Sequence, residues 1–255
     1  MTLAFDEEGA REVERVYSTP DIVRQRAEVL ALLGPRPGER ILDVGSGPGF
    51  LLASLAEAVG PEGAAHGLDP SPAMNALAAR RAGALAAVTL ALGEAETLPY
   101  PDEDLDAVVS TQVYEYVRDI PRAFAELRRV VRPGGRVLLL DTDWDSVVWH
   151  VADRARHARV MTAWEEHLVH PHLPAVWARH LTDAGFRVTA QTAVPILNPR
   201  LDEDTFSALI ARTVATYVAG RQGLTTDDAQ AWLADVRGGD YFFSMNRFCV
   251  LAVPA

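Results

Sequence analysis

Short apolar runs alternate with amphipathic segments along residues 21–140 of the chain. Runs typical of strands occupy residues 40–44, 64–68, 88–92, 105–110 and 136–140. Their apolar character suits strands that are covered on both faces of a parallel sheet. Between them lie segments with helical periodicity, such as residues 21–33, where apolar side chains recur at i, i+3, i+4 and i+7. The alternation predicts a doubly wound α/β fold.

The pattern changes after Asp141. Residues 144–184 are mostly helical in character, residues 186–194 and 241–253 resemble strands, and residues 201–220 and 225–236 form two further helical segments. We therefore predict a single domain over residues 1–255. We expect a helical lead at residues 1–35 and helical cap elements over a pocket at about 144–184 and 200–238.

The segment ERILDVGSGPGFLL, residues 39–52, is the most informative of the chain. A strand ends in an acid, Asp43, and is followed by Gly45, Gly47 and Gly49 and then by a helix. Glycine allows a tight turn and close approach of a ligand to the main chain, and the amides of the helix N-terminus point toward that ligand. The segment predicts a nucleotide-type pocket at the carboxyl edge of the first strand.

The spacing of the glycines separates two kinds of nucleotide site. Dinucleotide-binding loops read G-x-G-x-x-G, whereas this loop, with its acid, reads D-x-G-x-G-x-G. That pattern resembles motif I of the class I S-adenosylmethionine (SAM) dependent methyltransferases. Three later segments agree with the resemblance: an acid after the second strand, GEAETLPY at residues 93–100, and RRVVRPGGR at residues 128–136. The similarity is closest to the ubiquinone/menaquinone-biosynthesis branch, which methylates small molecules.

The resemblance implies a Rossmann-like sheet of seven mostly parallel strands, with the last strand antiparallel between strands five and six, and SAM as cofactor. It implies that Asp69 binds the ribose, with Met74 against the adenine and Glu94 on its amino group. Asp69 or Ser71 could instead cap a helix, Met74 could be a helix-core residue, and Arg26 could lie on the surface. The full set expected to bind SAM is Tyr17, Arg26, Asp43, Gly45, Ser46, Gly47, Gly49, Asp69, Pro70, Met74, Glu94, Ala95 and Gln112.

Methyl transfer from SAM is an in-line displacement that depends mainly on proximity and alignment, although an acceptor can also need a base. Candidates for that base are Tyr114 and Glu115 after the fourth strand, and His150 after the fifth. Relatives often show L-E-H where this chain has Y-E-Y, so the histidine of the family pattern is missing. His150 could equally be a surface histidine.

Histidines at positions 157, 167, 170 and 172, with two glutamates nearby, suggest a zinc site. Pro171, however, interrupts the helix between the last two histidines, and the i, i+4 pair of zinc proteases is absent. We expect no metal.

The charge and composition of the chain narrow the range of molecules that we expect it to bind. The net charge is −11, from 24 basic and 35 acidic residues, which argues against a nucleic-acid substrate. A single cysteine, Cys249, excludes an intramolecular disulfide. An amino-terminal signal and a long apolar span are both missing, so we expect a cytoplasmic protein that does not enter membranes. The expected partner is a small-molecule acceptor; the oligomeric state stays open, with a homodimer as one option.

Together these features predict a SAM-dependent methyltransferase that methylates a small-molecule metabolite, with O-, N- and C-methylation undecided. Three alternatives stay open: a SAM-binding protein with a regulatory or non-methylating role, a protein methyltransferase, and a nicotinamide-dependent oxidoreductase. The last is disfavoured by the glycine spacing and because the chain contains no lysine for a Tyr-x-x-x-Lys pair.

Overall fold

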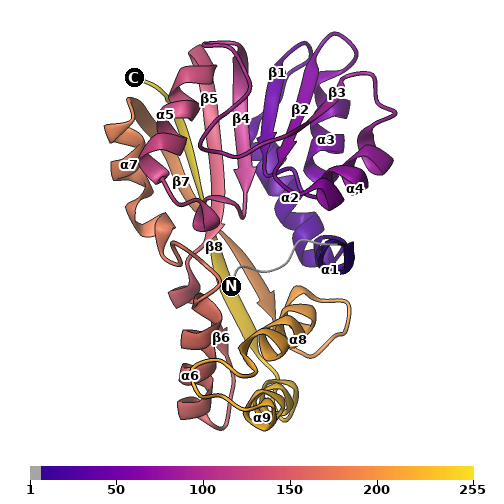
Figure 1. Cartoon of the computed structure of the whole chain (residues 1–255), viewed down its shortest axis with the longest axis vertical. Helices are drawn as coiled ribbons and strands as arrows, with labels where there is room; N and C mark the ends of the chain where they lie inside the picture. The colour runs from indigo at the N-terminus through magenta and orange to yellow at the C-terminus, as the bar shows by residue number, and fades with distance from the viewer. Residues whose placement is uncertain (1–6) are drawn as a thin grey trace.

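The protein is described by a computed structural model that covers residues 7–255; for residues 7, 8 and 10 only the backbone is described. The expected helical lead therefore lies partly outside the described residues. Its remainder forms two helices, α1 (Glu7–Tyr17) and α2 (Pro20–Leu33), as Figure 1 shows. Within residues 7–255, no helix is both long and apolar enough to span a membrane.

The sheet has the topology expected from the sequence. Its order is β3-β2-β1-β4-β5-β8-β6, and β7 pairs with β8 as well. Strands β1 to β5 are parallel to one another, whereas β8 is antiparallel to β5, β6 and β7. The strands are β1 (Arg40–Val44), β2 (Ala64–Asp69), β3 (Val88–Leu92), β4 (Leu105–Thr111), β5 (Val131–Thr142), β6 (Val148–Trp149), β7 (Phe186–Asn198) and β8 (Phe243–Pro254).

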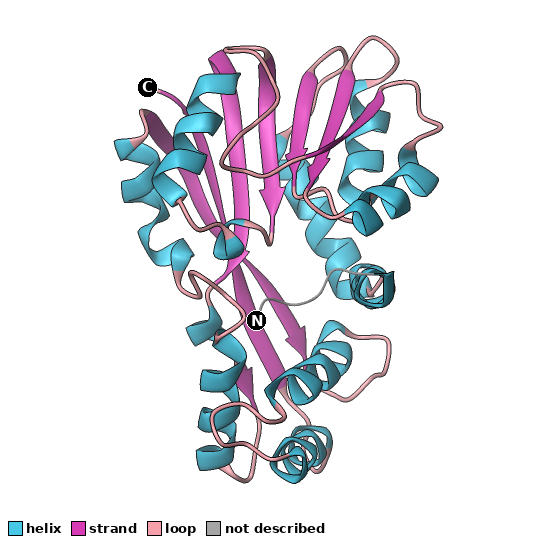
Figure 2. Ribbon diagram, in the orientation of Figure 1, coloured by secondary structure: helices cyan, strands magenta, loops and turns pink. Residues whose placement is uncertain are grey.

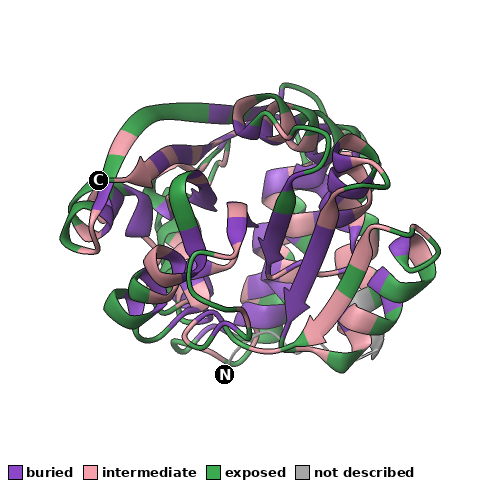
Figure 3. Ribbon diagram, turned by 90° about the horizontal axis from the view of Figure 1, so that it is seen from above, coloured by how far each residue is buried: buried purple, intermediate pink, exposed green. Residues whose placement is uncertain are grey.

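Helices cover both faces of the parallel part of the sheet (Figure 2). One face packs against α2, α3 (Phe50–Val59) and α4 (Pro72–Ala82), and the other against α5 (Ile120–Val130) and α7 (Trp177–Asp183). The central strands are buried between these layers, as Figure 3 shows. Burial on both faces explains why these strands are continuous apolar runs rather than alternating ones.

A second lobe extends below the carboxyl edge of the parallel strands (Figure 1). It consists of β6, α6 (Arg154–Glu165), α8 (Phe206–Val218), α9 (Thr226–Arg237) and the neighbouring ends of β7 and β8. A separate apolar core, which includes Trp149, Trp164 and Trp232, holds it together. Large aromatic side chains supply much buried apolar area per residue, which suits so small a core.

The segment expected as a cap at residues 144–184 divides between the two cores. Helix α6 belongs to the second lobe, but Trp177 and Leu181 of α7 pack in the core of the sheet with Phe124. Their i, i+4 spacing puts both side chains on one face of α7, and that face meets the sheet.

Candidate active site

A cavity of about 500 Å³ lies between the carboxyl edge of the parallel strands and the second lobe. One end is lined by the glycine loop after β1 and by the tips of β2 and β3, with α1 alongside. The other end is lined by aromatic and aliphatic side chains, several of them from the second lobe. These side chains are Tyr116, Trp144, Trp164, His167, Phe206 and Ile210.

The glycine loop has a backbone shape that favours glycine. Gly45, Gly47 and Gly49 have φ angles of 70°, 52° and 80°, in the left-handed region where a side chain is strained. Space is also limited, because a Cβ on Gly45 would lie 2.2 Å from Cγ2 of Val113. Gly45 and Gly47 line the cavity, whereas Gly49 precedes α3 and does not line it.

Asp69 holds the glycine loop from the tip of β2. Its Oδ2 accepts a hydrogen bond from the Gly47 amide at 2.9 Å, and its Oδ1 accepts one from the Ser71 amide at 2.8 Å. Burial raises the pKa of Asp69, although both hydrogen bonds act in the opposite direction. Ser71, not Asp69, accepts the hydrogen bond that caps α4. Asp69 is therefore a buried acceptor in the cavity wall.

Most of the residues expected to bind the cofactor meet in this cavity. Besides Asp69 and the two glycines, its lining includes Tyr17, Pro70, Met74, Glu94, Ala95 and Gln112. Met74 also packs on Leu77 and Val13, so it is at once a cavity residue and a helix-core residue.

Asp43, Ser46 and Arg26 lie beside the main cavity, around a smaller space of about 20 Å³. Burial raises the pKa of Asp43, and the nearby Asp69 adds to this effect. Oδ2 of Asp43 and Oγ of Ser46 are buried polar atoms without hydrogen-bond partners among the described residues. The Arg26 guanidinium lies 4.9 Å from the centre of the Phe50 ring.

Glu115 supplies a carboxyl group at the aromatic end of the cavity. It lies on the short 3₁₀ turn Tyr114–Tyr116 after β4 and is 1% exposed. Its Oε2 accepts a hydrogen bond from Nε1 of Trp144 at 3.0 Å. Burial raises the pKa of Glu115 to about 7, against the lowering effects of Trp144 and Arg247. A carboxyl group with this pKa can change its protonation state near neutral pH.

Two further buried charged groups lie near Glu115. Oδ1 of Asp141 accepts a hydrogen bond from the Val113 amide at 2.8 Å, and burial together with the charge of Glu115 raises its pKa. Arg247, on β8, lines the cavity and is 4% exposed. The positive charge of Arg247 lowers the pKa of both acids, but burial outweighs it.

Two of the expected catalytic side chains do not line the cavity. Tyr114 is 1% exposed and packs on Phe124, with ring centres 5.4 Å apart, in the core beside the sheet. Successive side chains of a 3₁₀ turn point about 120° apart, so Glu115 faces the cavity while Tyr114 does not. His150 follows β6 and is exposed; its amide donates to the carbonyl of Phe242. We therefore correct the expectation for both residues.

The histidines considered as metal ligands do not gather. His157 accepts a hydrogen bond from Nε1 of Trp232, and the Nδ1 of His167 donates to the Trp164 carbonyl. His172 pairs with Asp143 at 3.0 Å, which raises the pKa of the imidazole. Among residues 7–255, one group of three side chains has its possible ligand atoms within 4.8 Å of one another, and this group is Asp143, Asp145 and His172.

Comparison with known proteins identifies the family. Residues 42–139, from β1 through β5, match the family model of a methyltransferase domain. A demethylmenaquinone methyltransferase of Symbiobacterium thermophilum is 36% identical over 132 residues, which are 51% of this chain and 53% of that protein. The chain belongs to the class I SAM-dependent methyltransferases. The cofactor of this methyltransferase is SAM.

One relative extends the similarity beyond this domain. An uncharacterised 37.1 kDa protein from transposon TN4556 of Streptomyces fradiae is 35% identical over 242 residues, 92% of this chain and 68% of that protein. A 2-phytyl-1,4-naphtoquinone methyltransferase of Synechococcus elongatus is 38% identical over 109 residues, 42% of this chain and 47% of that protein. The methyltransferase thus spans about half the length of the quinone methyltransferases that it matches.

Solved structures share the fold. The phosphoethanolamine N-methyltransferase 2 of Haemonchus contortus, in complex with SAM, superposes with a TM-score of 0.66 at 21% identity, over 98% of this chain and 57% of that one. The geranyl diphosphate C-methyltransferase of Streptomyces coelicolor gives 0.58 at 16% identity, over 91% and 78%.

The residues of the glycine end are chemically suited to SAM. The glycine loop is lined by main chain without side chains, and Asp69 is a buried carboxyl group, the type of acceptor that suits ribose hydroxyls. The buried oxygens of Asp43 and Ser46 without partners are further acceptors beside it. A carboxylate suits the ammonium group of the methionyl part of SAM.

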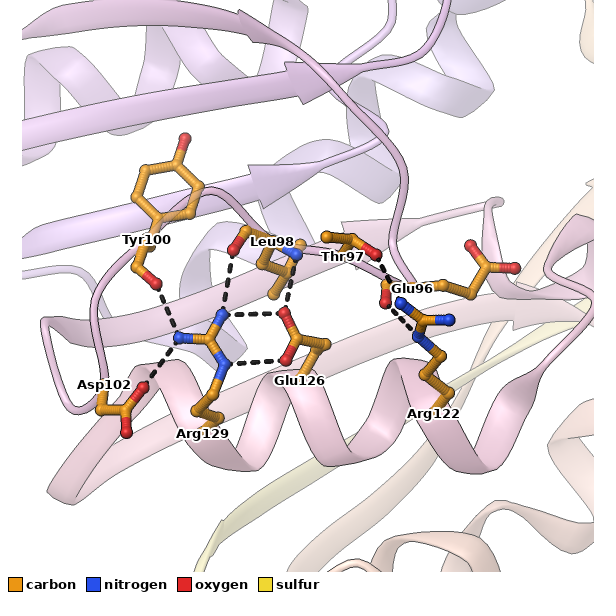
Figure 4. A network of polar contacts seen from close by, with 8 residues as sticks. All are labelled: Glu96, Thr97, Leu98, Tyr100, Asp102, Arg122, Glu126 and Arg129. Carbon is orange, nitrogen blue, oxygen red and sulfur yellow. Dashed lines mark hydrogen bonds and ion pairs between the residues drawn. The ribbon is translucent and has the colours of Figure 1, made fainter.

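Polar side chains of helix α5 hold the loop after β3, as Figure 4 shows for residues 96–102. Glu94 and Ala95, at the start of this loop, line the cavity. Arg129 donates to the carbonyls of Leu98 and Tyr100 at 2.9 and 2.7 Å, and it pairs with Glu126 through both carboxylate oxygens. Glu126 in turn accepts a hydrogen bond from the Leu98 amide at 2.8 Å. Arginine forms such a planar set of contacts, which lysine cannot reproduce.

Replacing Arg129 with methionine should loosen this loop. We expect a loss of about 1–2 kcal/mol of stability, because two carbonyls and a carboxylate lose their donor. We also expect S-adenosylhomocysteine (SAH) to bind about fivefold more weakly (~1 kcal/mol). Thermal unfolding and calorimetric titration measure the two effects. Arg128→Met, on the same helix, is the matched control; unchanged SAH affinity in Arg129→Met would show that this network does not position the loop.

Proposed function

We propose that this methyltransferase transfers the methyl group of SAM to a small, largely apolar, aromatic metabolite. The observation that carries the proposal is the continuity of one cavity from the glycine loop to the aromatic end. Binding sites for small molecules are concave and mostly apolar, with a few polar groups that fix orientation. The relatives that act on quinone precursors by name support an acceptor of this kind.

Glu115 is the proposed general base. SAM supplies a methyl group that is already activated by its sulfonium, so the protein must mainly align the acceptor and remove a proton where one is released. Glu115 is buried, lines the cavity and is oriented by the Trp144 indole. With its pKa raised to about 7 by burial, Glu115 is a stronger base than an ordinary carboxylate.

The second lobe encloses the acceptor end. Trp164 is 1% and Phe206 is 3% exposed, and both line the cavity. An enclosed aromatic site keeps water from the reacting atoms. It also favours a small acceptor over a segment of a folded protein.

The test is a transfer assay with trideuteromethyl SAM and a panel of hydroxylated naphthalenes, benzoic acids and naphthoic acids. We expect at least one compound to gain the labelled methyl group, as detected by mass spectrometry. Binding of SAH without transfer to any member of the panel would favour a regulatory SAM-binding protein. Binding of a nicotinamide cofactor in place of SAH would contradict the proposal altogether.

A further inference from the structure

The guanidinium of Arg247 is a buried positive charge in the wall of the cavity. It comes from β8, is 4% exposed and lies 4.8 Å from the centre of the Phe206 ring. Taking a charge out of water costs several kcal/mol unless the charge is paired or hydrogen-bonded. The partners of Arg247 therefore indicate what the cavity is built to bind.

The side-chain partners of Arg247 leave part of its guanidinium unpaired. Nη1 donates to Oε1 of Gln25, a neutral amide. Nε is buried and has no hydrogen-bond partner among residues 7–255. Arg136 shows the contrast, because its Nη1 and Nη2 pair with Glu39 at 2.8 and 2.7 Å and its Nε donates to the carbonyl of Leu33.

The acids around Arg247 do not neutralise it fully. Glu115, Asp141, Tyr17 and Tyr116 act on its charge through space. Burial raises the pKa of every one of these four groups, so their neutral forms are favoured. Arginine keeps its proton in proteins. The cavity therefore holds a buried positive charge beside acids whose neutral forms are favoured by burial.

A carboxylate fits this arrangement. With Nη1 engaged by Gln25 and Nε buried, Nη2 is the nitrogen left to donate to a carboxylate oxygen in the cavity. Phe206 lies beside the guanidinium, and the cavity is also lined by Trp144, Trp164 and Ile210, which suit an apolar ring system. We propose that the acceptor is an aromatic carboxylic acid whose carboxylate binds Arg247. This inference rests on the proposed function and names its class of acceptor.

The methionyl part of SAM also carries a carboxylate, so the test separates the two sources. Benzoate, 1-naphthoate and the matching amides are titrated into the protein with and without SAH, and SAH is titrated alone. We expect at least one acid to bind at least tenfold more tightly than its amide. In Arg247→Met this preference should be lost while SAH affinity stays within about twofold. Arg247→Lys should keep part of the preference, and Arg187→Met, at an exposed position on β7 outside the cavity lining, should keep all of it.

Three results would overturn the inference. The first is wild-type protein that prefers neither acid over its amide. The second is an acid preference that survives in Arg247→Met, with thermal unfolding showing that the variant is folded. The third is a loss of SAH affinity in Arg247→Met with the acid preference intact, which would assign Arg247 to the methionyl carboxylate. If the wild type binds the acids through Arg247 but does not bind SAH, the carboxylate site stands and the methyltransferase proposal fails.

Discussion

Glu115→Gln should lower kcat by about 10²–10⁴-fold while SAH affinity stays within about twofold. The loss corresponds to the usual contribution of a positioned general base. Glutamine keeps the size of the side chain and an oxygen that can accept from the Trp144 indole, so the cavity should keep its shape. Steady-state kinetics and calorimetry separate the two effects. Glu96→Gln, which changes another carboxylate in the cavity lining, is the matched control.

The pH dependence gives a second readout on Glu115. The base form is the carboxylate, so the wild-type rate should rise with pH through an apparent pKa near 7. The free energy of unfolding, in contrast, should fall as pH rises. Because burial raises the folded-state pKa above the usual 4.5, the contribution of Glu115 is fully present below pH 4.5 and is lost as pH rises to about 7. Glu115→Gln should remove both dependences. A variant that retains the wild-type pH–rate profile would show that another group is the base.

Asp69→Asn should weaken SAH binding by about 100-fold, or ~2.7 kcal/mol. The substitution removes the charge and places an amide NH₂ toward the backbone N–H of Gly47 or Ser71, where both carboxylate oxygens now accept. A hydrogen bond to a charged acceptor contributes about 1.5–3 kcal/mol, and the expected loss lies in this range. Calorimetric titration of SAH measures the change. Asp104→Asn, which alters a carboxylate paired with Arg40, is the control. Equal SAH affinity in Asp69→Asn and wild type would contradict the assignment of this acid to the cofactor.

The sequence predicts the glycine end of the site well because the information there is local. Gly45, Gly47 and Asp69 follow strands directly, and the carboxyl ends of parallel strands meet at one edge of a sheet. The closing strand was also predictable, since its apolar run and position match the expected antiparallel β8. The observed boundaries of β8 and β5 differ by a few residues from the predicted ones. Strand β5, for example, begins at Val131 and continues through the Pro-Gly-Gly segment.

The acceptor end could not be predicted in the same way. Whether Tyr114 or Glu115 faces the cavity depends on the 3₁₀ turn between them, and that geometry has no clear sequence signal. His150 and Trp144 are six positions apart, yet Trp144 lines the cavity while His150 is exposed beyond β6. Arg247 was not among the predicted site residues, because it lies far along the chain from the glycine loop. An arginine within the largely apolar segment FSMNRFCVLAVP was the available signal.

The most direct test of this account is a crystal structure of the protein with SAH. The account predicts SAH in the main cavity, with the ribose hydroxyls on Asp69 and the adenine beside Glu94 and Ala95. It predicts that the sulfur faces the end of the cavity lined by Glu115 and Trp144. SAH bound elsewhere, or with its sulfur directed away from Glu115, would contradict the proposal that one cavity joins the methyl donor to the acceptor.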